Sequence, residues 1–174
     1  RPSSHIDAPS EREGNRVVLN SLGEDIWPFI VDYAELFGLD PLGILALVIA
    51  ESGLNPNAER WGRLTTAAKS AIETGDMGSL QTIIDSQWPD ISFGYGQRIV
   101  LYHYLGTHEK TVENCLSVRG EVFANPLGDL YECAEKLLAC FKHRSCDGTL
   151  LSALIVYNAG SDRRSEPDWM SRWT

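Results

Sequence analysis

The chain has 174 residues, 43% of them hydrophobic, and its 15 Lys and Arg stand against 24 Asp and Glu for a net charge of −9. This length predicts one domain with a real hydrophobic core. The acidic balance argues against nucleic acid as the main partner, because phosphate binding needs clustered Lys and Arg. The net negative charge of the protein also repels an anionic polymer, so local groups would have to hold such a substrate. No stretch approaches the roughly 20 apolar residues of a membrane-spanning helix, so no membrane span is expected.

The N-terminal segment differs in composition from the rest of the chain. Residues 1–20 are rich in Ser, Pro, Glu and Arg and have no periodicity. This composition predicts a flexible lead-in over 1–20, followed by a folded domain over 21–174. The chain starts at Arg1 rather than Met and no secretory signal is visible. We therefore expect it to be a processed or excised piece of a longer protein.

Two helices are expected in the first part of the domain. Apolar residues at helical spacing predict one helix over 25–37. A second should start after Asp40, which can cap it, with Pro41 in the first helical position. The nearly continuous apolar run over 42–50 predicts that this second helix is buried on all sides, and Glu51 follows it without a break.

Glu51 is the residue on which a functional hypothesis can be built. A carboxylate at the end of a buried helix has partly apolar surroundings, and desolvation there raises its pKa. A general acid needs such a raised pKa near neutral pH. The alternative is a surface glutamate, although the C-terminal end of a helix is unfavourable for an anion because the helix dipole is negative there.

Weaker periodicity predicts helices over 64–72 and 77–88. A turn with two glycines follows at Ser92–Gln97. Residues 98–105 fit a helix or a strand, of which we favour the helix. A further helix is expected over 109–117.

The last third of the chain has the clearest helical pattern. Residues 125–141 predict an amphipathic helix opened by Asn-Pro, and residues 150–158 predict another, mostly apolar helix. Trp169 and Trp173 belong to a polar tail and either pack back on the body or form a binding edge. The fold class expected is therefore mainly α, with about seven to nine helices and little strand.

The four cysteines, at 115, 133, 140 and 146, lack the paired spacing of a zinc site, so no zinc site is expected from them. The enzyme hypothesis built on Glu51 needs no metal or other cofactor. Cys133 and Cys140 lie on one predicted helix, roughly 10 Å apart along its axis, and cannot bond to each other. The preferred hypothesis pairs Cys140 with Cys146 and Cys115 with Cys133. The alternative is four buried or half-buried thiols.

Four segments, in order, resemble the lytic transglycosylase and goose-type lysozyme families. Glu51–Ala58 is similar to the E-S-x-F-N-P-x-A segment around the family's catalytic acid, and Phe93–Gln97 is similar to its G-L-M-Q turn. Ala153–Gly160 is similar to its A-x-x-A-Y-N-A-G helix, and Asn125–Leu130 more weakly to N-P-x-x-N-I. The resemblance spans about residues 30–160. It implies a lysozyme-like helical domain with a groove that binds the glycan strands of peptidoglycan.

The chain departs from the family in the turn. Gly96 replaces the usual Met, and the Pro that commonly follows is absent. The gap between Glu51 and Gly94 is also longer than in the simplest transglycosylases. These departures affect the expected sugar subsites and leave the acid untouched.

The resemblance implies that Glu51 protonates the oxygen of the β-1,4 bond between N-acetylmuramic acid and N-acetylglucosamine. In a lytic transglycosylase, Glu51 then takes the proton of the muramic acid 6-hydroxyl, which closes a 1,6-anhydro ring. In the alternative, a hydrolytic muramidase, a second carboxylate positions water. Asp90 is the best candidate for that role and Asp85 the reserve, unless both are solvated loop acids. An alternative of another class is a catalytically silent glycan-binding or structural module.

The resemblance also implies roles for residues around the acid. The hydroxyl of Tyr157 would point to Glu51 and hold its carboxyl group. Asn158 would hydrogen-bond an N-acetyl group, Gln97 would line the groove, and Ser52 would support Glu51 or the substrate. Aromatic rings that could stack on sugars, although each is more often a core residue, belong to Tyr95, Trp88, Tyr102 and His103.

The expected partner is the glycan strand of peptidoglycan, with no nucleic acid. The corresponding setting is the cell envelope, the periplasm or the extracellular space. An acidic chain with an unstructured lead-in also suits a virion-associated enzyme, or a domain tethered within a larger virion or envelope protein.

Overall fold

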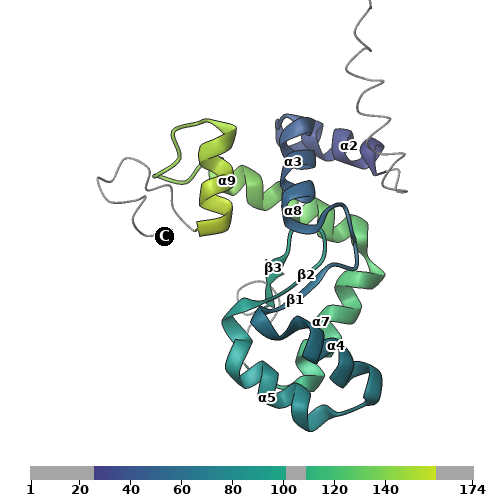
Figure 1. The fold of residues 1–174 in the computed structure, drawn as a ribbon. Helices are drawn as coiled ribbons and strands as arrows, with labels where there is room; N and C mark the ends of the chain where they lie inside the picture. Colours follow the sequence, from purple (N-terminus) through teal and green to yellow (C-terminus); the bar gives the residue numbers. More distant parts are fainter. Residues whose placement is uncertain (1–25, 101–108, 160–174) are drawn as a thin grey trace, which may run out of the picture.

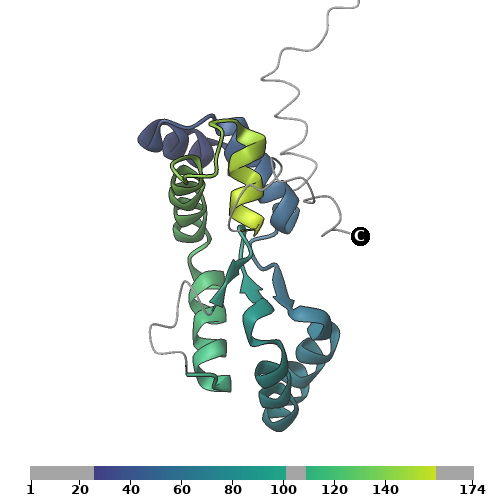
Figure 2. The same cartoon turned by 90° about the vertical axis from the view of Figure 1, so that its left-hand side faces the viewer.

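The computed structural model describes residues 26–100 and 109–159 (Figure 1). The predicted lead-in, Tyr102, His103 and the tail with Trp169 and Trp173 lie outside these residues. The described chain is mainly helical, as predicted. Its helices form two groups, and a small sheet lies between them in both views (Figures 1 and 2). None of the described helices is long and apolar enough to cross a membrane.

The first lobe packs four helices around one hydrophobic core. These are α2 (Trp27–Phe37), α3 (Pro41–Ser52), α8 (Pro126–Phe141) and α9 (Leu150–Ala159). Helix α8 starts after Asn125, whose side chain accepts from the N–H of Gly128 at 3.0 Å. Its buried residues recur at helical spacing, as the sequence predicted: Leu130, Cys133, Ala134, Leu137 and Cys140. This stripe packs α8 against α2, α3 and α9.

Helix α3 begins and ends as its sequence predicts. The carboxylate of Asp40 accepts from the N–H of Leu42 at 2.9 Å, and Gly53 ends the helix in the left-handed conformation, with φ 61°. The prediction that α3 is buried on all sides was wrong. Leu42 is 44% exposed and Ile49 40% exposed, because α2 and α8 cover one face of the helix and leave the other open.

The second lobe packs short strands and three helices around a separate core. Its elements are β1 (Glu59–Trp61), η1 (Gly62–Leu64), α4 (Thr65–Thr74), α5 (Met77–Gln87), η2 (Trp88–Asp90), β2 (Ile91–Phe93), β3 (Arg98–Ile99) and α7 (Val112–Ala124). The strands form an antiparallel sheet in the order β1-β2-β3. Trp61, Trp88 and Phe93 are almost fully buried in this core.

The predicted helix over 98–105 was wrong at its start. Residues 98 and 99 form strand β3, in which Ile99 pairs with Ser92 of β2. The turn after β2 brings the chain back antiparallel, so the backbone groups of these residues find partners on β2 rather than in a helix. β-branched residues such as Ile99 are well suited to a strand. Residues 101–105 of the predicted helix lie outside the described residues.

The preferred disulfide pairing is not formed, and all four cysteines are free thiols. Cys115 belongs to the core of the second lobe and Cys133 to that of the first, which separates the partners of one expected bond. Cys133 and Cys140 do share helix α8. Burial raises the pKa of Cys115 to about 12 and also raises that of Cys140. These thiols behave as small core residues.

A buried carboxylate joins the sheet of the second lobe to its helices. Glu59, at the start of β1, has a side chain that is 6% exposed and accepts from Nε and Nη2 of Arg119 on α7 at 2.6 and 3.2 Å. Nε1 of Trp61 donates to it at 3.1 Å, and Nζ of Lys69 on α4 lies 3.6 Å away. Burial alone would raise the pKa of Glu59, but these hydrogen bonds and charges outweigh it, so the pKa is lowered.

We expect Glu59→Gln to lower the free energy of unfolding by roughly 2–3 kcal/mol near neutral pH, because it leaves the half-buried Arg119 without its charged partner. A carboxylate whose pKa is lowered by folding stabilises the protein at pH values above its pKa in the unfolded state. This stabilisation is lost as the pH falls through its pKa in the folded state. The difference between the native protein and the variant should therefore shrink below the ordinary value of 4.5. Urea unfolding across pH tests this, with the exposed Glu35→Gln as control. An equal effect at pH 7 and pH 3 would contradict it.

Candidate functional site

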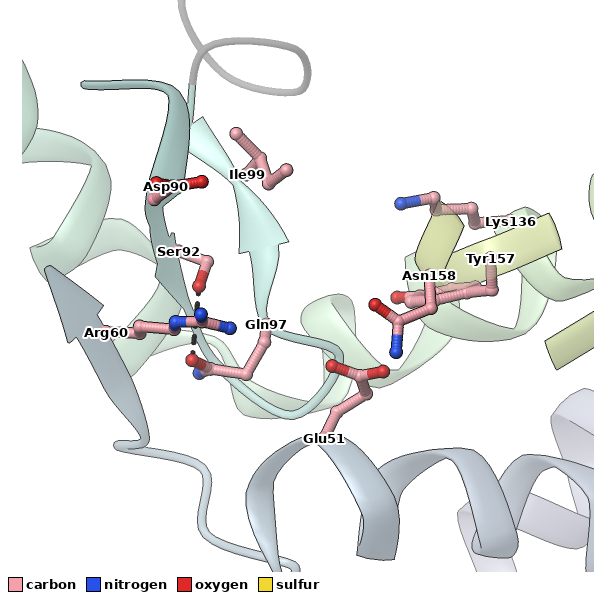
Figure 3. A pocket seen from close by; sticks show the side chains of 9 residues that line it. All are labelled: Glu51, Arg60, Asp90, Ser92, Gln97, Ile99, Lys136, Tyr157 and Asn158. Carbon is pink, nitrogen blue, oxygen red and sulfur yellow. Dashed lines mark hydrogen bonds between the residues drawn. The ribbon is translucent and has the colours of Figure 1, made fainter. Parts of the chain in front are cut away.

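A pocket of about 90 Å³ lies where the first lobe meets the sheet (Figure 3). The residues that line it come from α3, α8, α9, the sheet and the turns beside it: Glu51, Arg60, Asp90, Ser92, Gln97, Ile99, Lys136, Tyr157 and Asn158. In Figure 3 the side chains of the sheet form one wall, and Lys136, Tyr157 and Asn158 form the other. Glu51 lies between these walls.

Glu51 occupies the last turn of α3, where the apolar helix meets the pocket. Burial raises the pKa of Glu51, and the positive charges of Lys136 and Arg60 lower it only in part. The net shift is upward, as the sequence predicted for a carboxyl group at the end of a largely apolar helix. The side chain of Asn158 points toward this carboxyl group from the end of α9 (Figure 3). A carboxyl group with a raised pKa keeps its proton to a higher pH than an exposed glutamate does and can donate that proton to a ligand.

We expect Glu51→Gln to stabilise the fold near neutral pH. The folded state raises the pKa of Glu51, so it binds more protons than the unfolded state in the window above the ordinary value of 4.5. The stability of the native protein should therefore fall as the pH rises through that window, whereas glutamine stays neutral. Thermal unfolding should give the variant the higher Tm at pH 7 and nearly equal values below pH 4.5. A lower Tm for the variant at pH 7 would contradict the account.

Asp90 lies on the wall formed by the sheet, at the end of η2 directly before strand β2. It shares the pocket with Glu51, as the hypothesis of a second carboxylate requires. Asp85, the reserve candidate, lies on α5, where its carboxylate accepts from Nε2 of Gln81 at 3.0 Å, and it does not line the pocket.

The turn between β2 and β3 is fixed by a buried carboxylate. Asp129 of α8 is 3% exposed and accepts from the N–H of Tyr95 at 2.6 Å. Gly94 has φ 83°, and a Cβ atom there would collide with the Asp129 carboxylate and with the side chain of Val122. A glycine is therefore required at this point, for its backbone conformation and for the close approach of Asp129.

Gln97 ties this turn to the segment that follows Glu51. Its Nε2 donates to the carbonyls of Ala58 and Gly94, both at 3.0 Å, and its Oε1 accepts from the hydroxyl of Ser92 at 3.2 Å. The backbone of Gln97 has φ 45°, a left-handed conformation that is uncommon for a residue other than glycine. Gln97 lines the pocket, and its amide group links the turn to Ser92 and Ala58.

Tyr157 lines the pocket but uses its hydroxyl differently from the prediction. The hydroxyl donates to the carbonyl of Gly96 at 3.0 Å and so joins α9 to the turn. A phenol has one proton to donate, so its oxygen can serve Glu51 only as an acceptor. Nζ of Lys136 lies 4.2 Å from the centre of the Tyr157 ring, a cation–π distance.

Three other candidates lie outside the pocket. The hydroxyl of Ser52 donates to the carbonyl of Val48 at 2.9 Å, one turn back in α3. Tyr95 is 2% exposed in the core of the first lobe, and Trp88 is 1% exposed in the core of the second lobe. Both rings are core residues, which was the alternative to sugar stacking in the sequence analysis. They offer little surface to a sugar.

Arg60 and Lys136, which bring two positive charges to the pocket, were not predicted from the sequence. Arg60 lies between Glu59 and Trp61 on β1. Because successive side chains of a strand point to opposite faces, Arg60 points away from the buried face. Lys136 lies three residues after Cys133 on α8, close to the inward stripe. Recognition of strand β1 and a helical projection of α8 would have revealed both.

Among residues 26–100 and 109–159, no group of three or more His, Cys, Asp or Glu side chains could hold a metal ion. Comparison of the chain with protein-family models, curated proteins and solved structures found no match.

Proposed function

We propose that the protein cleaves the β-1,4 bond between N-acetylmuramic acid and N-acetylglucosamine in peptidoglycan, with Glu51 as the general acid. The observation that carries the proposal is the position of Glu51 in a pocket where burial raises its pKa. A carboxyl group whose pKa is raised is better suited to protonate a leaving sugar oxygen than an exposed glutamate is.

The proposed family is that of the lytic transglycosylases and goose-type lysozymes. Its support is the convergence of three segments that are far apart in the sequence. Glu51 comes from the first, Gln97 from the second, and Tyr157 with Asn158 from the third, and all four line one pocket. In this proposal the two lobes are those of a lysozyme-like domain, and the pocket is part of the groove that binds the glycan strand.

The favoured reaction is that of a lytic transglycosylase. Glu51 gives its proton to the bridging oxygen as the bond from that oxygen to C1 of the muramic acid residue breaks. The substrate's own N-acetyl group stabilises the positive charge that develops at C1. The Glu51 carboxylate then removes the proton of the 6-hydroxyl, and O6 attacks C1 to form the 1,6-anhydro ring. Glu51 is protonated again at the end, so one residue serves as acid and then as base.

The second candidate is a muramidase, and the presence of Asp90 in the same pocket as Glu51 favours it specifically. A carboxylate there can accept a proton from a water molecule that attacks C1 while Glu51 protonates the leaving oxygen. The two candidates share the acid and the substrate. They differ in the attacking oxygen, which is O6 of the sugar in one and water in the other.

Asp90→Asn separates the two reactions. We expect the variant to release soluble fragments from purified peptidoglycan at nearly the native rate, because the transglycosylase does not use Asp90 as a base. A muramidase that depends on Asp90 should lose about a hundredfold to ten-thousandfold in rate. Asp85→Asn, outside the pocket, is the matched control. A large loss of rate for Asp90→Asn, but not for Asp85→Asn, would contradict the transglycosylase and support the muramidase.

If the native protein binds glycan strands but releases no fragments, it is a silent glycan-binding or structural module.

The setting proposed for the enzyme is the cell envelope, the periplasm, the extracellular space or a virion, where peptidoglycan is within reach.

A further inference from the structure

Arg60 brings to the pocket a positive charge that residues 26–100 and 109–159 leave unpaired. Its side chain is exposed and lines the pocket from the middle of strand β1. Among the described residues, its guanidinium forms no hydrogen bond and no ion pair. The guanidinium group carries five N–H donors in one plane, a geometry that matches a carboxylate.

The carboxylates beside Arg60 in the strand and in the pocket form no ion pair with it. Glu59, its neighbour in the strand, is turned to the other face and bound to Arg119 and Lys69. Glu51 and Asp90 line the same pocket but lie beyond ion-pair distance of the guanidinium. In Figure 3, Arg60 lies alongside Ser92 and Gln97, on the wall that faces Lys136.

The whole molecule repels an acidic polymer, because its net charge is −9. The pocket is an exception, since Arg60 and Lys136 place positive charge on both of its walls. Both charges lower the pKa of Glu51 in part. The charge of Arg60 can also select a substrate that carries an anion beside the scissile bond.

We propose that Arg60 is a specificity-determining residue that binds a carboxylate on the O3 substituent of the muramic acid residue, with Lys136 adding attraction from the opposite wall. This proposal rests on the proposed function and names the part of the glycan that the pocket selects. The O3 substituent ends in a lactyl carboxylate where the peptide has been removed, and carries the carboxylates of the peptide where it is present. N-acetylglucosamine has no such group.

The test measures binding by titration calorimetry in a Glu51→Gln background, so that no strand is cut during the measurement. Three glycan strands are compared: peptide-free strands with the lactyl carboxylate, strands that carry peptides, and peptide-free strands whose carboxylate has been converted to a neutral methylamide. Arg60→Gln removes the charge in the pocket. Arg63→Gln removes the same charge from an exposed position in η1 outside the pocket and is the matched control.

We expect Arg60→Gln to weaken the binding of a carboxylate-bearing strand about tenfold to a hundredfold, the usual loss for a hydrogen-bonded charge. Binding of the methylamide strand should not change, nor should Arg63→Gln have an effect. A loss confined to peptide-free strands assigns the lactyl carboxylate, and a loss confined to peptide-bearing strands assigns the peptide.

Equal affinity of the Arg60→Gln and parent proteins for all three strands would overturn the proposal. An equal loss on all three, including the neutral strand, would also overturn it, because the role of Arg60 would then be structural. Failure of the proposed function has a different signature. The charge-dependent binding would persist, while the native protein with Glu51 in place would release no fragments from the same strands.

Discussion

Glu51→Gln should lower the rate of peptidoglycan cleavage by about a hundredfold to ten-thousandfold, the usual contribution of a positioned acid and base. Glutamine has nearly the shape of the protonated glutamic acid but has no acidic proton to donate. The turn of α3 and the capping Gly53 do not involve this side chain, so the variant should fold and bind glycan strands. Release of dye-labelled fragments from purified peptidoglycan measures the rate.

Glu73→Gln is the matched control, since it makes the same chemical change at an exposed position on α4. It should retain the native rate. A Glu51→Gln protein that cleaves peptidoglycan as fast as the control would contradict the assignment of Glu51 as the acid. A variant that fails to bind strands would point instead to a role of Glu51 in binding.

Gly94→Ala should lower the free energy of unfolding by about 3 kcal/mol. The left-handed conformation of Gly94 costs an alanine roughly 1 kcal/mol or more. The added Cβ would also displace the buried Asp129 carboxylate from the N–H of Tyr95, at a further cost of roughly 1–3 kcal/mol. For a domain of this size the midpoint of thermal unfolding should fall by roughly 6–12 °C.

Gly38→Ala separates the two contributions. Gly38 ends helix α2 with φ 66°, but a Cβ there would have no atom within 4 Å. This variant should therefore lose only about 1 kcal/mol, from backbone strain alone. Equal losses for the two variants would show that Asp129 and the close approach at Gly94 contribute little to stability.

The sequence predicted the helices well because their signals are local. The apolar repeat of α8 and the Asn125 cap lie within one segment, and so do the Asp40 cap and the Gly53 end of α3. The short strands were not predicted, because β1 and β3 are stabilised by pairing with β2 rather than by their own composition. The partial exposure of α3 was missed because an apolar run does not reveal how many neighbours will cover it.

The position of Glu51 in a pocket with a raised pKa agrees with the expectation from its helix. The hydrogen bonds of the residues around Glu51 depend on contacts between distant segments. Tyr157 donates to Gly96, and Asp129 accepts from Tyr95, which no local pattern specifies. Asp129 lies in the segment Asn125–Leu130, which was singled out in the sequence, but its hydrogen bond to Tyr95 was not predicted.

The central claim, that Glu51 directs the formation of an anhydro ring, is tested most directly by mass spectrometry of the fragments released from purified peptidoglycan. The account predicts fragments that end in 1,6-anhydro-muramic acid, lighter by one water than the reducing ends made by hydrolysis, and release of these fragments about a hundredfold or more slower from Glu51→Gln. Reducing ends in place of anhydro ends would contradict the transglycosylase and leave the muramidase with Asp90. Anhydro ends from Glu51→Gln at the native rate would contradict the role of Glu51 itself.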